Sequence, residues 1–310
     1  MTTHQIQGLH HVTSLASGAV SNNDFFTKVL GLRRVKKTVN FDNPQVYHLY
    51  YGNERGDQGS VMTYFPFEGA KRGSHGTGEV GQTNFAVPVG TLDAWQDRLA
   101  AHKVAGVTRD TLFGAGRLNF AGPDGDGFAL IEAEDERPHW GGADISDQMA
   151  IRGFHGASIR LDDTGAMAEL LQFMGYAPVE TRDDITRLAV EKGNGANVID
   201  LQKAAADPAT QGAGSVHHIA FSVKDRAAQL DIRQALIDTG YNVTPVIDRN
   251  YFWAIYFRTP GGVLFEIATD EPGFDHDESL TDLGQALKLP PQHAHLREVL
   301  EAKYLAPISD

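Results

Sequence analysis

The 310-residue sequence contains no cysteine. This absence excludes disulfide bonds, thiolate nucleophiles, and zinc or iron-sulfur sites bound by cysteine. Histidine, aspartate and glutamate therefore remain as the candidate ligands for a metal ion.

Two further shortages narrow the class of protein. No apolar run is long enough for a membrane span or for a signal-peptide core after Met1, so a cytoplasmic protein is expected. Basic residues are outnumbered, with 27 Lys and Arg against 40 Asp and Glu and a formal net charge of -13. This balance argues against nucleic acid or an anionic membrane as a partner, although solubility alone also explains it. A homo-oligomer is possible, because no pattern in the sequence argues for or against one.

The length favours a duplicated architecture, because 310 residues exceed the usual size of one domain. Four segments, beginning near residues 7, 82, 153 and 215, each predict a strand, a helix and then further strands. We therefore expect an α+β fold of four βαβββ modules in two tandem domains, with mixed sheets curved into half-barrels and a C-terminal helical tail. The expected parts are a first domain at 1–137, a linker at 138–147, a second domain at 148–270 and the tail at 271–310.

Local signals refine the first module and the tail. A helix is expected from Ser21 to Leu30, with Ser21-Asn22-Asn23-Asp24 as N-cap residues and Gly31 after its end. Strands are expected at 33–40, 45–51 and 60–65. The tail has no counterpart in the repeat, so we interpret it as a lid over a site or as an oligomer contact.

One carboxylate, Glu266, stands in an apolar strand pattern after the Thr-Pro-Gly-Gly turn at 259–262. A buried carboxylate is costly unless a cation or metal compensates it. The best candidates for its surroundings are the doublets His10-His11 and His217-His218. A single buried histidine is more often a hydrogen-bonded core residue, but two doublets and a strand carboxylate favour a metal site.

An overlay of the four modules tests this interpretation. His11 and His218 share one position, where the second and third modules carry Asn84 and Gly156. Ala129 in the second module is equivalent to Glu266. Ligand-type residues are thus confined to modules one and four. If modules pair into half-barrels, one cup holds all three side chains and the other is chemically empty.

Strand alternation decides which histidine of each doublet enters the cup. His218 and Glu266 are expected to face the cup, and His217 the opposite side. His11 is also assigned to the cup, in phase with Thr13, although Leu9 shares that face. Two histidines and one carboxylate form a facial set with three open positions, which favours non-haem Fe(II). Mn(II) fits the same ligands, whereas structural zinc usually has four protein ligands.

Tyr256 and Arg249 are the further candidates near the cup. Tyr256 is in phase with Ala254, and a phenol and a guanidinium suit a substrate that binds as a phenolate. Tyr256 also has an ordinary interpretation as a core aromatic residue. Arg249 has one as a member of an ion pair at the end of the hairpin. We interpret His48 and the remaining histidines as surface or loop residues. His155 matches His10 in the overlay, but Gly156 stands at the ligand position, so we interpret His155 as a remnant of a histidine doublet.

Several segments together resemble one family. They are Leu9-His-His-Val-Thr13, Val216-His-His-Ile-Ala220, Asp248-Arg249, Ile255-Tyr256-Phe-Arg258, Pro260-Gly-Gly-Val-Leu-Phe-Glu266-Ile-Ala-Thr-Asp270, Gly273-Phe-Asp275 and Leu289-Pro-Pro291. Over nearly the whole chain the sequence resembles the vicinal oxygen chelate superfamily, which has glyoxalase/bleomycin-resistance/dioxygenase-type domains. More narrowly, it resembles the hydroquinone and chlorohydroquinone ring-cleaving dioxygenases of that superfamily.

The resemblance implies Fe(II) on His11, His218 and Glu266. It also implies that His10, Thr13, His217, Arg249 and Tyr256 surround the metal as catalytic residues. Alternation sends His10 and His217 away from the cup, so these roles require a twist, a bulge or a position at its rim.

The sequence thus favours a ring-cleaving dioxygenase acting on a small aromatic diol and O2. One alternative is a glyoxalase-like lyase or isomerase, against which Ala129 counts, since such sites usually carry an additional ligand. The other is a non-enzymatic binder of aromatics or a sensor of quinones, which has little use for three intact ligands.

Overall fold

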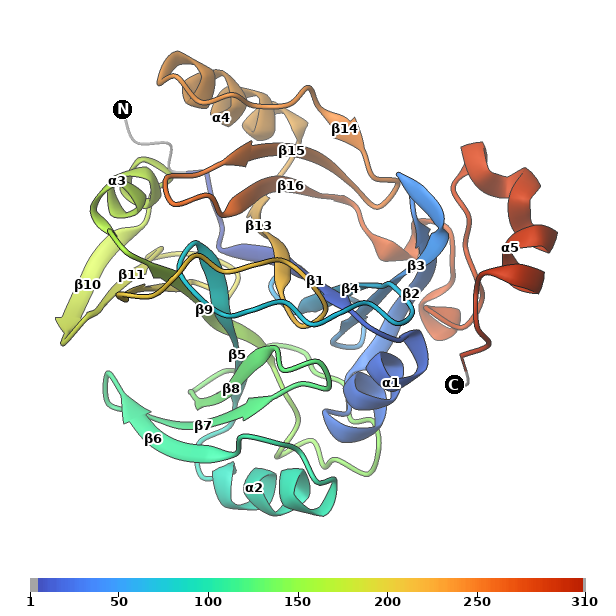
Figure 1. The fold of residues 1–310 in the computed structure, drawn as a ribbon, viewed down its shortest axis with the longest axis horizontal. Coiled ribbons are helices and arrows are strands. Elements are labelled where there is room, and N and C mark those ends of the chain that lie inside the picture. The colour runs from blue at the N-terminus through green and yellow to red at the C-terminus, as the bar shows by residue number, and fades with distance from the viewer. Residues whose placement is uncertain (1–4, 309–310) are drawn as a thin grey trace.

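The computed structural model describes residues 5–308 and contains two eight-stranded sheets. Figure 1 shows the helices α1 to α4 at the outside of the curved sheets, with α5 beside β2 and β3. No helix in the described part is long and apolar enough to cross a membrane.

The four expected modules are present. The first contains β1 (Leu9–Ala16), α1 (Ala19–Asp24), the π-helical turn η1 (Phe25–Val29), β2 (Arg33–Asn40), β3 (Asn43–Gly52) and β4 (Val61–Pro66). The second contains β5 (Glu79–Val87), α2 (Leu92–Ala101), β6 (Thr108–Leu112), β7 (Ala115–Ala121) and β8 (Gly127–Glu132). The third contains β9 (Gly153–Leu161), α3 (Gly165–Phe173), β10 (Ala177–Arg182), β11 (Ile185–Ala189) and β12 (Val198–Lys203). The fourth contains β13 (Val216–Val223), α4 (Arg226–Asp238), β14 (Ile247–Asp248), β15 (Phe252–Arg258) and β16 (Leu264–Pro272).

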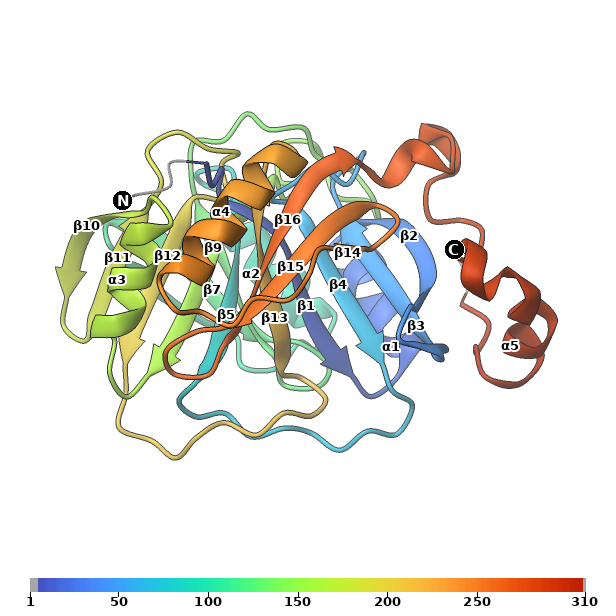
Figure 2. The ribbon, with the colours of Figure 1, turned by 90° about the horizontal axis from the view of Figure 1, so that it is seen from above.

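Each sheet joins one module from the first half of the chain to one module from the second half. One sheet has the order β14-β15-β16-β13-β1-β4-β3-β2, so it combines modules one and four. The other has the order β10-β11-β12-β9-β5-β8-β7-β6 and combines modules two and three. Figure 2 shows β1 and β13 side by side near the centre of the molecule. The predicted architecture of two glyoxalase-type domains with curved half-barrel sheets is therefore confirmed.

Alternation along the strands separates a core face from a cup face. Phe265 and Ile267 of β16 belong to the main hydrophobic core, together with Trp95 of α2 and Leu236 of α4. Ala268 of the same strand belongs to a smaller apolar cluster on the other face. The helices therefore bury the core faces, and the opposite face of the first sheet stays available for a site.

A β-bulge interrupts this alternation at the first histidine doublet. Leu9 pairs with Phe221, whereas His11 pairs with Ala220, so His10 is the additional residue. The bulge reverses the phase of β1, and Leu9 packs in the main core although it stands two residues before His11. This resolves the expected conflict between Leu9 and His11.

The second doublet carries an equivalent bulge on β13. His218 pairs with Thr13, whereas Val216 pairs with Ser14, so His217 is the additional residue. The second sheet has the same two irregularities, where β5 and β9 pair with register shifts around Gly81 and between residues 154 and 156. The bulges are therefore part of the repeated fold, and the doublets make use of them.

The start of the first helix differs from the prediction. α1 begins at Ala19, and Gly18 at its N-cap makes no side-chain hydrogen bond. The backbone N–H of Ala19 instead donates to Glu68 Oε1 over 2.8 Å. The residues from Ser21 to Asp24 lie inside the helix, so their assignment as N-cap residues was wrong. A side chain distant in sequence has replaced the local cap.

The tail covers the edge strand β2. It contains η2 (Phe274–His276), η3 (Leu280–Asp282), η4 (Pro291–Leu296) and α5 (Arg297–Lys303). The fully buried Lys36 of β2 places its Nζ 2.6 Å from Asp277 and 2.5 Å from Glu278. Lys37 forms a β-bridge with Leu287 of the tail. These contacts fix the tail against the first module and protect an edge that could otherwise pair with another chain.

Candidate metal centre

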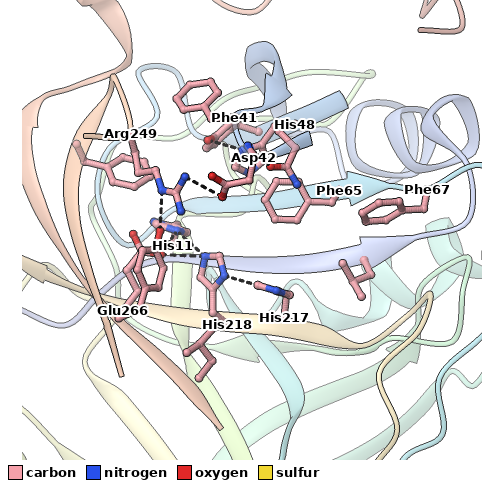
Figure 3. A pocket seen from close by; sticks show the side chains of 16 residues that line it. His11, Phe41, Asp42, His48, Phe65, Phe67, His217, His218, Arg249 and Glu266 are labelled. Carbon is pink, nitrogen blue, oxygen red and sulfur yellow. Dashed lines mark hydrogen bonds and ion pairs between the residues drawn. The ribbon is translucent and has the colours of Figure 1, made fainter. Parts of the chain in front are cut away.

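The cup of the first sheet contains a cavity of about 450 Å³. Its apolar lining consists of Leu15, Phe41, Phe65, Phe67, Phe252 and Leu264. Its polar lining consists of His11, Asn40, Asp42, His48, Tyr50, His217, His218, Arg249, Tyr256 and Glu266. Although more of the lining residues are polar than apolar, most of the lining surface is apolar, and such a cavity has the character of a small-molecule site. Figure 3 shows the polar groups converging from several strands.

His11, His218 and Glu266 come together at this cavity, from β1, β13 and β16. His11 Nε2 lies 3.3 Å from His218 Nε2 and 3.4 Å from Glu266 Oε2. The distance between His218 Nε2 and Glu266 Oε2 is 2.9 Å. All three side chains are buried, and among residues 5–308 they are the only group of three or more with this potential for metal binding.

The donor set fits a divalent cation. The two Glu266 oxygens are buried and make no hydrogen bond of ordinary geometry in the described structure. Two imidazole nitrogens and a carboxylate that converge without a shared proton repel one another through their lone pairs. Metal bonds of roughly 2.1 Å at right angles place facial ligands about 3 Å apart, close to the observed separations. A bound cation therefore accounts for both the orphaned oxygens and the close approach.

The remaining nitrogen of each of these imidazoles contacts the preceding histidine. His11 Nδ1 lies 2.9 Å from His10 Nδ1, and His218 Nδ1 lies 2.8 Å from His217 Nδ1. If Nε2 binds a cation, Nδ1 carries the hydrogen and donates it outward. Both doublets can therefore fix the tautomer and the ring orientation of the inner imidazole.

The two outer histidines lie in different surroundings. His10 is buried and is absent from the cavity lining, and its Nε2 lies 3.2 Å from the carbonyl oxygen of Thr269. His217 lines the cavity, contrary to the expectation from alternation, because its bulge displaces it from the strand phase. Thr13 is fully buried and its hydroxyl lies 2.8 Å from the hydroxyl of Thr63. Thr13 therefore contacts the site only through other side chains.

Tyr256 and Arg249 lie on the mouth side of the cavity. Tyr256 stands directly opposite Glu266 in the antiparallel pair β15 and β16, so both face the cup. Arg249 Nε donates to the Tyr256 hydroxyl oxygen over 3.1 Å, and Arg249 Nη1 donates to Asp42 Oδ2 over 3.1 Å. The three residues form a polar strip leading from the mouth toward Glu266.

Burial and neighbouring charges shift the acidity of these groups. Burial raises the pKa of Glu266, but the His11 and His218 imidazoles outweigh burial and hold the pKa well below its ordinary value. Burial lowers the pKa of His217 to about 4, with a contribution from His218. Burial, followed by the Glu266 charge, raises the pKa of Tyr256 well above its ordinary value. At neutral pH the site therefore presents a carboxylate, a neutral His217 and a protonated phenol.

His48 was placed wrongly at the surface by the sequence interpretation. It lines the cavity, and its Nε2 and Nδ1 lie 2.8 Å from the hydroxyls of Thr63 and Tyr50, respectively. Tyr47, Leu49 and Tyr51 belong to the main core, so alternation along β3 places His48 and Tyr50 in the cup. That alternation was the available signal. Phe41 and Asp42 lie on a turn, where no periodicity could indicate their role.

Within residues 5–308, the second cup has no group of three residues that could hold a metal ion. The register corrects the module overlay, because Gln82, rather than Asn84, follows the bulge at Gly81 and pairs with Ser158 as His11 pairs with Ala220. Gly156 follows the other bulge, as His218 does, and Ala129 pairs with Asn84 as Glu266 pairs with Ala220. The cup is nevertheless polar rather than empty. It contains a cavity of about 190 Å³ whose lining includes Arg117 and Asp200.

Comparisons with known proteins agree with this fold. A family model described as the Glyoxalase/Bleomycin resistance protein/Dioxygenase superfamily matches residues 8–130 and 127–267. The Bacillus subtilis (strain 168) protein named "Putative ring-cleaving dioxygenase MhqO" is 43% identical over 296 residues, which cover 95% of this chain and 94% of that protein. The chlorohydroquinone/hydroquinone 1,2-dioxygenase of Sphingobium indicum is 36% identical over 306 residues, covering 96% and 95%.

A solved structure is also similar over almost its entire length. The crystal structure of a "putative dioxygenase" from Bacillus subtilis has a TM-score of 0.95 and 42% sequence identity, with 98% of both chains covered. Two consecutive matches to one family model and this similarity show that the chain belongs to the Glyoxalase/Bleomycin resistance protein/Dioxygenase superfamily.

Proposed function

We propose that the protein is a ring-cleaving dioxygenase that inserts both atoms of O2 into a hydroquinone- or catechol-type aromatic. The observation that carries the proposal is the convergence of His11, His218 and Glu266 at an apolar-walled cavity. The names of the Bacillus subtilis and Sphingobium indicum relatives support it. The resident metal in this proposal is non-haem Fe(II), and Mn(II) fits the same ligands.

His11, His218 and Glu266 would hold the metal and leave adjacent coordination positions open. When bound, Fe(II) supplies a redox-active centre at which a diol and O2 can be held side by side. The phenylalanines and leucines of the cavity wall hold the aromatic ring and exclude water.

Tyr256 and His217 would handle the substrate hydroxyls. The Tyr256 oxygen accepts a hydrogen bond from Arg249 Nε, which leaves the phenol hydrogen to donate to a substrate oxygen. Arg249 favours negative charge on that oxygen. If His217 Nδ1 accepts from His218, its Nε2 carries a hydrogen that can donate to the second hydroxyl. The two donors would orient the diol and stabilise charge that develops during the reaction.

His10 and Thr13 have supporting roles in this proposal. His10 orients the His11 ring, because it contacts His11 on one side and the Thr269 carbonyl on the other. Thr13 holds Thr63, whose hydroxyl in turn bonds His48 at the cavity wall. Neither side chain lines the cavity, so both are positioning residues.

O2 uptake tests the proposed function. The protein is reconstituted anaerobically with Fe(II) and then given O2 with chlorohydroquinone, methylhydroquinone or catechol. We expect uptake and a ring-opened product that carries both atoms of labelled O2. Glu266→Ala should abolish turnover, whereas His155→Ala, in the equivalent bulge region of the second sheet, should retain it. Full turnover by Glu266→Ala contradicts the assignment, and O2-independent activity with Ni(II) or Zn(II) favours a lyase or isomerase.

A further inference from the structure

An ion pair joins the two ends of the first half-barrel across the cavity mouth. Asp42 lies between β2 and β3, and Arg249 lies between β14 and β15. β2 and β14 are the two edge strands of this sheet. Asp42 Oδ2 accepts a hydrogen bond from Arg249 Nη1 over 3.1 Å, as Figure 3 shows. Residues distant in sequence therefore meet at an exposed part of the cavity lining.

Arg249 is the only lysine or arginine in the described lining of this cavity. Its Nε is directed to Tyr256 and its Nη1 to Asp42, so the guanidinium has partners on the inner and the outer side. The Arg249 side chain is 20% exposed and the Asp42 side chain is 76% exposed. Asp42 thus stands on the solvent side of the cation and opposes its charge at the entrance.

The turn that carries Asp42 is held from both sides. The backbone N–H of Asp42 donates to Asn40 Oδ1 over 2.9 Å. The neighbouring carbonyl oxygen of Phe41 lies 2.9 Å from His293 Nε2 in the tail. Both Phe41 and Asp42 line the cavity. The tail therefore supports this wall of the mouth and keeps the Asp42 carboxylate close to Arg249.

We propose that Asp42 is a specificity-determining residue that makes the cavity select uncharged aromatic rings over rings that bear a carboxylate. This proposal rests on the proposed function and names its substrate class more closely. A carboxylate on the ring favours a basic side chain as partner, and the single basic side chain of the described lining is already paired with Asp42. A ring carboxylate close to Arg249 also meets the like charge of Asp42. A neutral diol needs no cation as partner and is not repelled by Asp42. The cavity therefore selects neutral over carboxylated rings by disfavouring the carboxylated ones.

The test replaces the charge but keeps the shape, in the variant Asp42→Asn. Dissociation constants of phenol and benzoate are measured on the metal-loaded protein without O2, because neither probe needs turnover. We expect the affinity ratio of benzoate to phenol to rise by up to about fivefold, which is the upper end of the range for a partly exposed ion pair. The kcat/KM ratio of 2,5-dihydroxybenzoate to hydroquinone should move in the same direction.

Two matched variants complete the experiment. Asp231→Asn removes the same charge from the exposed face of α4 and should leave the ratio unchanged. Asp42→Glu retains the charge and should keep the ratio of the unmodified protein. If Asp42→Asn raises the affinities for benzoate and phenol equally, Asp42 restricts access of both probes to the cavity, and the proposal is overturned. Unchanged affinities for both probes would overturn it as well. Failure of the proposed function would appear separately, as absent O2 uptake with the binding ratio still shifted.

Discussion

His10 links the inner imidazole of His11 to the backbone of Thr269. Its Nδ1 lies 2.9 Å from His11 Nδ1, and its Nε2 lies 3.2 Å from the Thr269 carbonyl oxygen. One tautomer satisfies both contacts, in which His11 Nδ1–H donates to His10 and His10 Nε2–H donates to the carbonyl. Burial and the neighbouring His11 lower the pKa of His10 to about 3, so it stays neutral and can accept that hydrogen.

The first prediction concerns this orienting contact. His10→Ala should weaken metal binding by about 10-fold to 100-fold, because the His11 ring loses the partner that fixes its orientation. Competition with a chelator of known affinity measures the change. The control is His155→Ala, which removes a partly buried imidazole at a corresponding bulge of the second sheet. Equal losses in the two variants would show a general effect of the substitution and contradict the specific role.

Metal should stabilise the folded protein through the same site. Saturation at roughly 100 times the dissociation constant adds about 2.7 kcal/mol to the free energy of unfolding, or about 4 °C in Tm for a chain of this size. Anaerobic thermal unfolding with and without Fe(II) or Mn(II) measures the shift. Glu266→Gln should lose most of it, because one of three ligands is replaced. A shift of the same size in that variant would place the stabilising metal elsewhere.

A third prediction concerns Asp126, which lies in the Gly122–Gly127 turn and bonds the Tyr64 hydroxyl. Burial raises the pKa of Asp126 from 3.8 to about 6. The folded protein therefore binds the proton more tightly than the unfolded chain does. The contribution of this group is fully present below about pH 4 and is lost as the pH rises through 6, with a magnitude of about 2 to 3 kcal/mol.

Asp126→Asn should remove that pH dependence. The free energy of unfolding of the variant should exceed that of the unmodified protein at pH 7, and the difference should shrink toward pH 4. Denaturant unfolding across this range measures it. Tyr64→Phe should move the transition of the group to higher pH, because the Tyr64 hydrogen bond lowers the Asp126 pKa. A constant difference between pH 4 and pH 7 would contradict the raised pKa.

The fourth prediction concerns the buried cation that holds the tail. Lys36→Ala leaves Glu278 buried without its partner, which typically costs about 3 to 5 kcal/mol. We expect a lower Tm and faster proteolysis within the tail. Lys28→Ala is the matched control, because its pair with Asp24 is exposed and such pairs contribute under about 1 kcal/mol. Similar Tm losses in both variants would argue against a structural role for the buried pair.

Much of the architecture could be predicted because the same pattern recurs. Repetition revealed four modules, and alternation assigned His218, Glu266 and Tyr256 to the cup face, where the structure has them. The alternation rule became ambiguous for His11 and wrong for His217, since a bulge adds one residue and reverses the phase. A bulge depends on pairing with another strand, and the local sequence does not encode that pairing.

Long-range contacts explain the other differences. The cap of α1 comes from Glu68, and the support for Phe41 comes from His293, so neither partner is near in sequence. His48 is a different case, because its strand does alternate clearly. A lone histidine without a doublet offered no reason to examine that alternation.

The pairing of modules one and four also bears on the order of events during synthesis. His11 leaves the ribosome early, but β13 and β16, which carry His218 and Glu266, follow more than two hundred residues later. A nascent chain that has completed only modules one to three still lacks two of the three donors. If the site binds a metal as proposed, loading is a late step of biogenesis, because chains interrupted before β16 lack Glu266 and cannot complete the donor set.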